Sequence, residues 1–304
     1  MSSQSGSKAV VAALTANLGI AVAKFVAFII TGSSSMLAEG VHSVVDSGNQ
    51  VLLLFGGRQA RRDADAEHQF GYGRDRFIYG FLVALVIFSA GGLFALSEGI
   101  GKLRHPHELD SPLIAVGVLL VSIVAEGLSL RTALRESREV KGQQSWPRFI
   151  RTSKVPELPV VLLEDSAALV GLVLALAGVG LAQATGDPVW DAIGTIAIGV
   201  LLILVAAVLV VETKSLLLGE SATPATQQII ERELVGAGIE RVIHLRTLYL
   251  GPDELMVAAK IAMPAVATLA AVARETDNAE ARVRAAVPEV TLMYLEPDVD
   301  GRAG

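Results

Sequence analysis

The feature that most constrains this chain is a series of long, nearly uncharged runs of apolar residues. A helix needs about 20 mostly apolar residues to cross a bilayer, and these runs reach that length. The composition agrees, because 52% of the 304 residues are hydrophobic, only 18% are charged and the mean hydropathy is +0.54. We therefore predict a polytopic α-helical membrane protein. Its six transmembrane helices are expected at residues 9–31, 36–57, 77–100, 112–133, 158–183 and 188–218.

Lysine and arginine are unevenly distributed over the loops between these runs. The loops after the first and fifth runs have none. The loops after the second and fourth runs are rich in them: Arg58, Arg61, Arg62, Arg74, Arg76, Arg135, Arg138, Lys141, Arg148, Arg151 and Lys154. Because Lys and Arg favour cytoplasmic loops, both termini are predicted to be cytoplasmic. The Ala-, Arg- and Gly-rich composition favours a bacterial plasma membrane.

The character of the sequence changes after Leu218. The segment TPATQQIIERELVGAG predicts a capped amphipathic helix, and two strands around a GPDE turn follow it. A second helix and a closing strand, EVTLMYLEP, complete the order α-β-β-α-β. We therefore predict two domains, the transmembrane domain at residues 1–218 and a small α+β domain at residues 219–304, with two helices on one face of a three-stranded sheet.

Three ionisable residues interrupt the second apolar run. Glu39, His42 and Asp46 have the spacing i, i+3 and i+7, which places them on one helix face, and Asn49 continues that face. A carboxylate in hydrocarbon costs about 2.5–3.5 kcal/mol even on insertion scales, so the stripe must face protein, water or a cation. A His and an Asp four residues apart can ligate one divalent ion. The alternative is a polar stripe that joins helices through hydrogen bonds.

The fifth run opens with two adjacent acids, Glu164 and Asp165. Neighbouring helical residues point about 100° apart, so only one of them can face the stripe directly. We favour Asp165 as the ligand and Glu164 as a proton carrier or supporting group. Together with His42 and Asp46 they make a site of one nitrogen and three oxygen donors. The chain has no cysteine, and such a donor set suits zinc, manganese, iron(II) or cobalt.

Other polar residues within the apolar runs are weaker signals. For Glu98 and Glu126, hydrogen bonding between helices is the favoured interpretation. Lys24 is expected to extend toward the interface or to pair with an acid. Asp191 is expected to stabilise the amino terminus of its helix through the negative charge of its side chain.

The loop DADAEHQFGYGRDRF contains a second candidate metal site. Asp65 and His68 are spaced to share a metal ion at the cytoplasmic mouth of the helices. A solvated loop is the favoured interpretation, because polar surface loops of this composition are common.

Three segments together resemble the cation diffusion facilitator family of zinc/proton antiporters. They are SMLAEGVHSVVDSGNQ, HQFGYGRDRF and VVLLEDSAALVG, and the resemblance covers nearly the whole chain. The last segment, with LVSIVAEGLSL before it, is most similar to the branch that contains the mammalian zinc transporter nine and its bacterial relatives. The resemblance implies a homodimer, alternating access and a tetrahedral transport site built from the second and fifth spans. For residues 219–304 it implies a ferredoxin-like, metallochaperone-like dimerisation domain.

The match to the family's site is incomplete. His42 and Asp46 match its first half, and Asp165 matches the aspartate of its second half. Val161 stands where the family usually has a histidine, and the adjacent Glu164 is a candidate to compensate. Metal preference and coordination number therefore stay open.

The tail departs further from the family. Residues that in well-studied bacterial members bind regulatory zinc correspond to Ile243, Lys260, Tyr294 and Glu296, and His244 is the tail's one histidine. We therefore expect a dimerisation domain without a zinc cluster of that kind.

The resemblance and the stripe together predict a divalent metal transporter, in the first place zinc efflux by exchange with protons. In this cycle the metal binds His42, Asp46 and Asp165, and protons displace it on the same groups. The alternative is a non-transporting membrane adaptor that acts through its tail, but an adaptor has no need to keep costly charges inside the bilayer. The sequence contains no nucleophile–base pair or cofactor motif that would predict an enzyme, and no basic cluster that would predict nucleic-acid binding.

Overall fold

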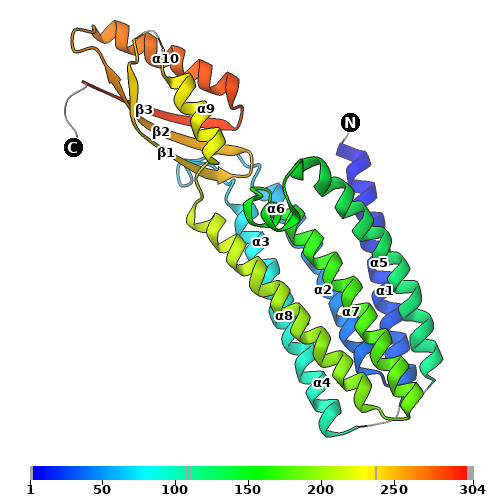
Figure 1. Ribbon diagram of the computed structural model, residues 1–304. Coiled ribbons are helices and arrows are strands. Elements are labelled where there is room, and N and C mark those ends of the chain that lie inside the picture. Colours follow the sequence, from blue (N-terminus) through cyan, green and yellow to red (C-terminus); the bar gives the residue numbers. More distant parts are fainter. Residues whose placement is uncertain (1–2, 107–108, 110, 237, 300–304) are drawn as a thin grey trace. The chain divides into compact units, whose positions relative to one another are not determined.

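The computed structural model describes residues 3–299 except 107–108, 110 and 237 (Figure 1). The outer ends of the two predicted domains, residues 1–2 and 300–304, therefore lie outside the described residues. The chain divides into two compact units. One comprises residues 1–57 and 78–213, and the other comprises residues 58–77 and 214–304.

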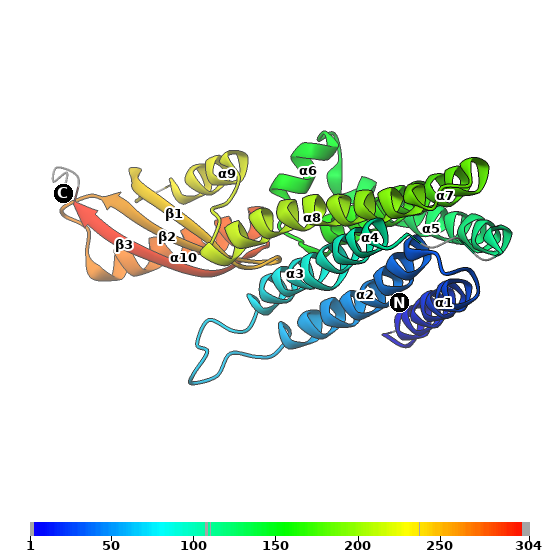
Figure 2. The same ribbon diagram turned by 90° about the horizontal axis from the view of Figure 1, so that it is seen from below.

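The first unit is a bundle of long helices. Its elements are α1 (Ser3–Thr31), α2 (Ser34–Gln59), α3 (Asp75–Val86), the π-helical stretch η1 (Ile87–Leu93), α4 (Phe94–Arg104), α5 (Pro112–Lys141), α6 (Trp146–Thr152), α7 (Glu157–Thr185) and α8 (Val189–Leu218). α7 packs along α5, and α1 packs along the same helix. Figures 1 and 2 show α8 running beside α3 and α4.

Four helical segments in the described part of the chain are long and apolar enough to cross a membrane. They are Asp75–Arg104, Pro112–Lys141, Glu157–Thr185 and Val189–Leu218. α1 contributes the shorter apolar helix Asn17–Thr31. α2 has the length, but Glu39, His42 and Asp46 lower its hydropathy. A helical membrane bundle is thus confirmed, while the count of six spans stays a prediction.

Glycines allow α4 and α8 to pack closely. A Cβ on Gly199 of α8 would lie 2.7 Å from the backbone nitrogen of Leu96, and a Cβ on Gly99 of α4 would lie 2.9 Å from that of Ile196. Real Cβ atoms do not approach backbone so closely, so both positions require glycine. Small residues at helix contacts are typical of bundles in lipid, where tight packing replaces the hydrophobic effect.

A buried ion pair joins three helices at the end of the bundle where α2 begins. Lys102 Nζ of α4 lies 2.8 Å from Asp191 Oδ2 of α8, and both side chains are almost completely buried. Asp191 also accepts hydrogen bonds from the Ser33 hydroxyl, and from the backbone and hydroxyl of Ser34 at the start of α2. Asp191 therefore connects three helices, whereas the sequence predicted only an interaction with the amino terminus of its own helix.

The second unit contains α9 (Pro224–Leu234), β1 (Arg241–Gly251), β2 (Glu254–Met263), α10 (Leu269–Ala286) and β3 (Val290–Val299). The sheet order is β1-β2-β3, with β2 antiparallel to β1 and parallel to β3. Alternate β2 residues, Leu255, Val257, Ala259 and Ile261, share a core with Ile230 of α9 and Val283 of α10. Both helices therefore cover one face of the sheet, and the predicted α-β-β-α-β order is confirmed.

Replacing Asp191 with Ala tests the buried ion pair. The change leaves the Lys102 ammonium buried without its counter-ion, and breaking a buried pair in this way costs about 3–5 kcal/mol. We expect a clear fall in the thermal unfolding temperature of the detergent-solubilised protein. Asp187→Ala is the control, because Asp187 is exposed and only caps the start of α8. Equal stability of the two variants would contradict the assigned role.

Candidate metal centre

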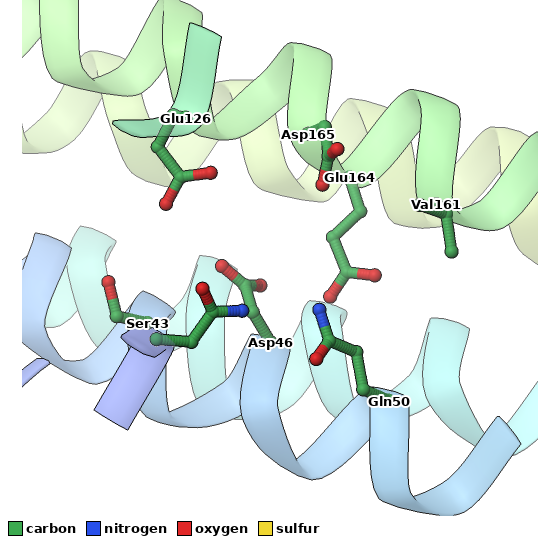
Figure 3. Close-up of a pocket in the computed structure, with 8 residues that line it drawn as sticks. Ser43, Asp46, Gln50, Glu126, Val161, Glu164 and Asp165 are labelled. Atoms are coloured by element: carbon green, nitrogen blue, oxygen red, sulfur yellow. The ribbon is translucent and has the colours of Figure 1, made fainter. Parts of the chain in front are cut away.

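Residues from four helices line a small pocket within the bundle (Figure 3). They are Asn17 of α1, Ser43, Asp46 and Gln50 of α2, Glu126 of α5, and Val161, Glu164 and Asp165 of α7. The cavity measures about 10 Å³, which is room for about one water molecule and therefore for a single ion. Four of its eight lining residues are acidic, so the pocket is suited to a cation.

The α2 stripe forms a wall of this region, as its helical spacing predicts. Glu39, His42, Asp46 and Asn49 are all buried. Five of their side-chain atoms have no hydrogen-bond partner among the described residues: Glu39 Oε1, His42 Nδ1, His42 Nε2, Asp46 Oδ1 and Asn49 Oδ1. Two of these atoms, His42 Nδ1 and Asp46 Oδ1, face each other at 3.3 Å. Buried polar atoms are nearly always paired, so this cluster has donor capacity available for a cation.

His42 and Asp46 lie together at the centre of the stripe. His42 Nδ1 is 3.3 Å from Asp46 Oδ1, across one helical turn. Asp46 lines the pocket, whereas His42 lies beside it and is 1% exposed. Neither ring nitrogen of His42 makes a hydrogen bond in the described structure, so both lone-pair positions of the ring are candidates for a metal ligand.

The two acids of α7 point in different directions. Glu164 faces the stripe, because its Oε1 accepts a hydrogen bond from Asn49 Nδ2 at 2.7 Å. Asp165 accepts a hydrogen bond from the Ser129 hydroxyl of α5 at 2.8 Å. Both line the pocket together with Asp46, and Glu164 is the one hydrogen-bonded to α2.

The structure adds Glu126 to this set. Its side chain extends from α5 into the pocket, toward Asp46 in Figure 3. The sequence favours hydrogen bonding between helices for this residue, because it lies among Gly and Ser. Val161 lies in the pocket wall too, so an apolar side chain lines the pocket at the position where the family resemblance implies a histidine.

The pocket is a loose assembly of ligands. No three His, Asp or Glu side chains within the described residues converge closely enough to hold a metal ion. The donors present are imidazole and carboxylate, which suit zinc and other first-row divalent ions. A metal ion would draw the carboxylates of α2 and α7 together, so its binding requires a shift of these helices or of their side chains.

The second candidate pair lies in the loop at residues 58–77, which belongs to the other unit. His68 Nδ1 is 3.6 Å from Asp65 Oδ1, and both side chains are nearly half exposed. The carboxylate is already engaged: Asp65 accepts hydrogen bonds from the Tyr72 hydroxyl at 2.6 Å and from the backbone N–H groups of Glu67 and His68. These bonds, that of Tyr72 foremost, lower the pKa of Asp65 to about 2. They shape the loop, and a metal would have to displace them.

An ion pair occupies two of the tail positions that correspond to regulatory metal ligands in the family, Lys260 and Glu296. Lys260 Nζ lies 3.3 Å from Glu296 Oε1 and 2.9 Å from Asp298 Oδ2, and these contacts raise the pKa of Lys260. His244 stands opposite Lys260 in the register of β1 and β2, and its side chain is exposed. A lysine ammonium thus pairs with two acids of this sheet face.

Comparisons with known proteins agree with the motifs. The family model for the cation efflux transmembrane domain matches residues 10–218. The mitochondrial proton-coupled zinc antiporter SLC30A9 of Mus musculus is 36% identical over 224 residues, which is 73% of this chain and 39% of that protein. Metal tolerance protein C4 of Arabidopsis thaliana is 32% identical over 220 residues, covering 72% of this chain and 48% of that protein.

A shorter match joins the chain to the cation-efflux pump FieF of Yersinia pestis, 37% identical over 93 residues, or 31% of each protein. The chain spans about two fifths of the length of the SLC30A9 antiporters. The resemblance drawn from the motifs, including its branch, is confirmed by these relatives. All of them are named as transporters or metal tolerance proteins, which agrees with the expectation that the chain is not an enzyme.

Glu126→Gln tests the residue that the structure adds. The change keeps the shape of the side chain and removes one negative charge from the pocket. Supporting groups of this kind change metal affinity about 10- to 100-fold, so we expect zinc binding at least about tenfold weaker in equilibrium dialysis of the protein in nanodiscs. Glu98→Gln, outside the pocket, is the matched control. Unchanged binding by Glu126→Gln would exclude Glu126 from the site.

Tyr72→Phe tests the hydrogen bonds of the loop. The Asp65 pKa of about 2 lies below its ordinary 3.8. The bonded loop is therefore fully stable above about pH 4 and loses that stabilisation as the pH falls through 2. Without the Tyr72 hydroxyl, we expect the Asp65 pKa to rise toward 3.8 in a carboxyl-carbon NMR titration. A titration midpoint that stays near 2 would show that the backbone donors alone hold the carboxylate.

Proposed function

Since this chain belongs to the cation efflux family, we propose that it carries divalent metal ions, zinc in the first place, across a membrane in exchange for protons. The observation that carries this proposal is the stripe of buried polar groups on α2, five of whose side-chain atoms make no hydrogen bond in the described structure, beside an acidic pocket that Asp46 lines. A purely structural polar stripe would satisfy its own hydrogen bonds, because each unpaired buried group is costly. A stripe that binds and releases a cation must leave its donors unpaired in the empty state.

The donor chemistry supports zinc. His42, Asp46, Asp165 and Glu164 offer one nitrogen and carboxylate oxygens, a set that zinc accepts in tetrahedral geometry. Manganese, iron(II) and cobalt are alternative substrates, because carboxylates suit them as well. The name of the SLC30A9 relatives, proton-coupled zinc antiporter, supports zinc for this chain also.

The crowding of acids in the pocket supports proton exchange. Asp46 and Glu164 share this small pocket with two more acids, and carboxylates crowded in a poorly solvated site can take up a proton in place of standing as adjacent anions. A metal ion needs both groups deprotonated, so it releases that proton on binding. Protons arriving from the opposite side would in turn displace the metal. One set of residues thereby couples the two fluxes.

Around this site we propose six spans with both termini cytoplasmic, in a bacterial plasma membrane. α1 and α2 would supply the two spans beyond the four strongly apolar segments. α2 can lie in lipid because its acids face the bundle. We further propose residues 1–218 and 219–304 as the functional domains, the second being a ferredoxin-like dimerisation domain. A metal-independent dimer fits its sheet face, where Lys260 is paired with acids.

Flux measurements on the full chain test the function. Proteoliposomes with an imposed pH gradient are loaded with zinc, manganese, iron(II) or cobalt, for wild type, Asp46→Asn and the control Glu98→Gln. We expect gradient-dependent zinc flux in wild type and control, and a loss of at least about 100-fold in Asp46→Asn, which removes both a ligand and a proton site. If no metal is transported by folded, dimeric protein, the adaptor interpretation replaces this one. Flux in Asp46→Asn equal to wild type would overturn the assigned site.

A further inference from the structure

Lys24 of α1 is a buried cation beside the α2 stripe. Its side chain is 1% exposed, and its Nζ donates hydrogen bonds to Glu39 Oε2 at 3.0 Å and to Ser43 Oγ at 2.8 Å. Glu39 and Ser43 are one turn apart on α2, and His42 belongs to the same turn. The ammonium group therefore lies against the turn of α2 that carries the metal-site histidine.

Helix packing alone does not explain this ion pair. Removing a lysine and a carboxylate from water costs several kcal/mol for each ion, and well-packed apolar residues often stabilise a fold equally well. The pair is also asymmetric, because Glu39 Oε1 is buried without a hydrogen-bond partner among the described residues. Gly171 of α7 leaves room for this atom, since a Cβ there would lie 2.7 Å from it. Glu39 thus keeps one oxygen unpaired on the same face as His42.

The pair is next to the pocket. Ser43, which accepts a hydrogen bond from Lys24, lines the pocket together with Asp46. Glu39 and His42 are three residues apart, so their side chains are neighbours on the helix surface. A Glu39 carboxylate released from Lys24 would therefore be attracted to a cation bound at His42.

We propose that Lys24 is a tethered cation that holds Glu39 out of the metal's coordination. By occupying this carboxylate, Lys24 limits the α2 stripe to one imidazole and one carboxylate ligand, His42 and Asp46. The metal is then bound loosely enough to be released. This inference rests on the proposed function and assigns Lys24 a positioning role, because its ammonium acts on the metal through Glu39.

The test is direct cobalt binding to the full chain in nanodiscs, followed by visible absorption, which reports coordination geometry. In Lys24→Met we expect Glu39 to join the metal, with affinity at least about tenfold higher and an altered spectrum, because one more charge contact forms in a shielded site. In flux assays of Lys24→Met, both kcat and KM for the metal should fall, because the metal is bound more tightly and released more slowly. Lys24→Gln, which keeps a polar group beside Ser43, should shift binding in the same direction.

Three further variants separate this role from a structural one. Lys24→Met combined with Glu39→Gln should restore wild-type affinity and spectrum, because the additional ligand is gone. Lys24→Arg should resemble wild type, because it keeps the cation. Lys102→Met removes the other buried, ion-paired lysine of the bundle and should leave cobalt binding unchanged.

The outcomes distinguish the two proposals. Folded Lys24→Met and Lys24→Gln that bind cobalt no more tightly than wild type, with an unchanged spectrum, would overturn the role of Lys24 while the transporter stands. Wild-type protein that binds no cobalt and no zinc would overturn the proposed function, and the role of Lys24 with it.

Discussion

The cost of placing charge in a poorly solvated bundle governs the organisation of this protein. Two lysines and their acids meet that cost by pairing: Lys102 with Asp191, and Lys24 with Glu39. The first pair also satisfies serines at the start of α2, and so connects three helices. The pocket acids have no such cation among the described residues. The contrast between paired and unpaired charges separates the groups that hold the helices together from those that can receive a metal ion.

The same contrast supports the proposal that a metal ion and protons share one site. Asp46 and Glu164 line one small pocket, and neither ring nitrogen of His42 makes a hydrogen bond in the described structure. Acids crowded in such a pocket repel one another when charged, and either a proton or a divalent ion reduces that repulsion. Because the ligands are loosely assembled, neither occupant is held as a structural zinc ion would be. Weak preorganisation suits a site that must release its cargo on the other side of the membrane.

The stripe on α2 was predictable from sequence because helical periodicity alone places Glu39, His42 and Asp46 on one face. The α-β-β-α-β order was predictable for a similar reason, since caps and alternation are local signals. Glu126 was not, because its position depends on how α5 is rotated against α7, and packing between distant segments sets that rotation. The orientation of the two α7 acids was not predictable either. Their adjacency in the sequence fixes only the angle between their side chains, and the structure shows through the contact of Asn49 with Glu164 which one faces α2.

Lysine has a comparable role at two places in the chain. On the tail sheet, Lys260 pairs with Glu296 and Asp298, and Lys260 and Glu296 correspond to positions where the family resemblance implies metal ligands. In the bundle, Lys24 pairs with Glu39, one turn from His42. An ammonium group is a cation that cannot leave, so it stabilises a carboxylate permanently and withdraws it from exchange. Carboxylates left without such a partner remain available to mobile cations. The placement of lysines, as much as that of acids, therefore determines where a divalent ion can bind and from where it can depart.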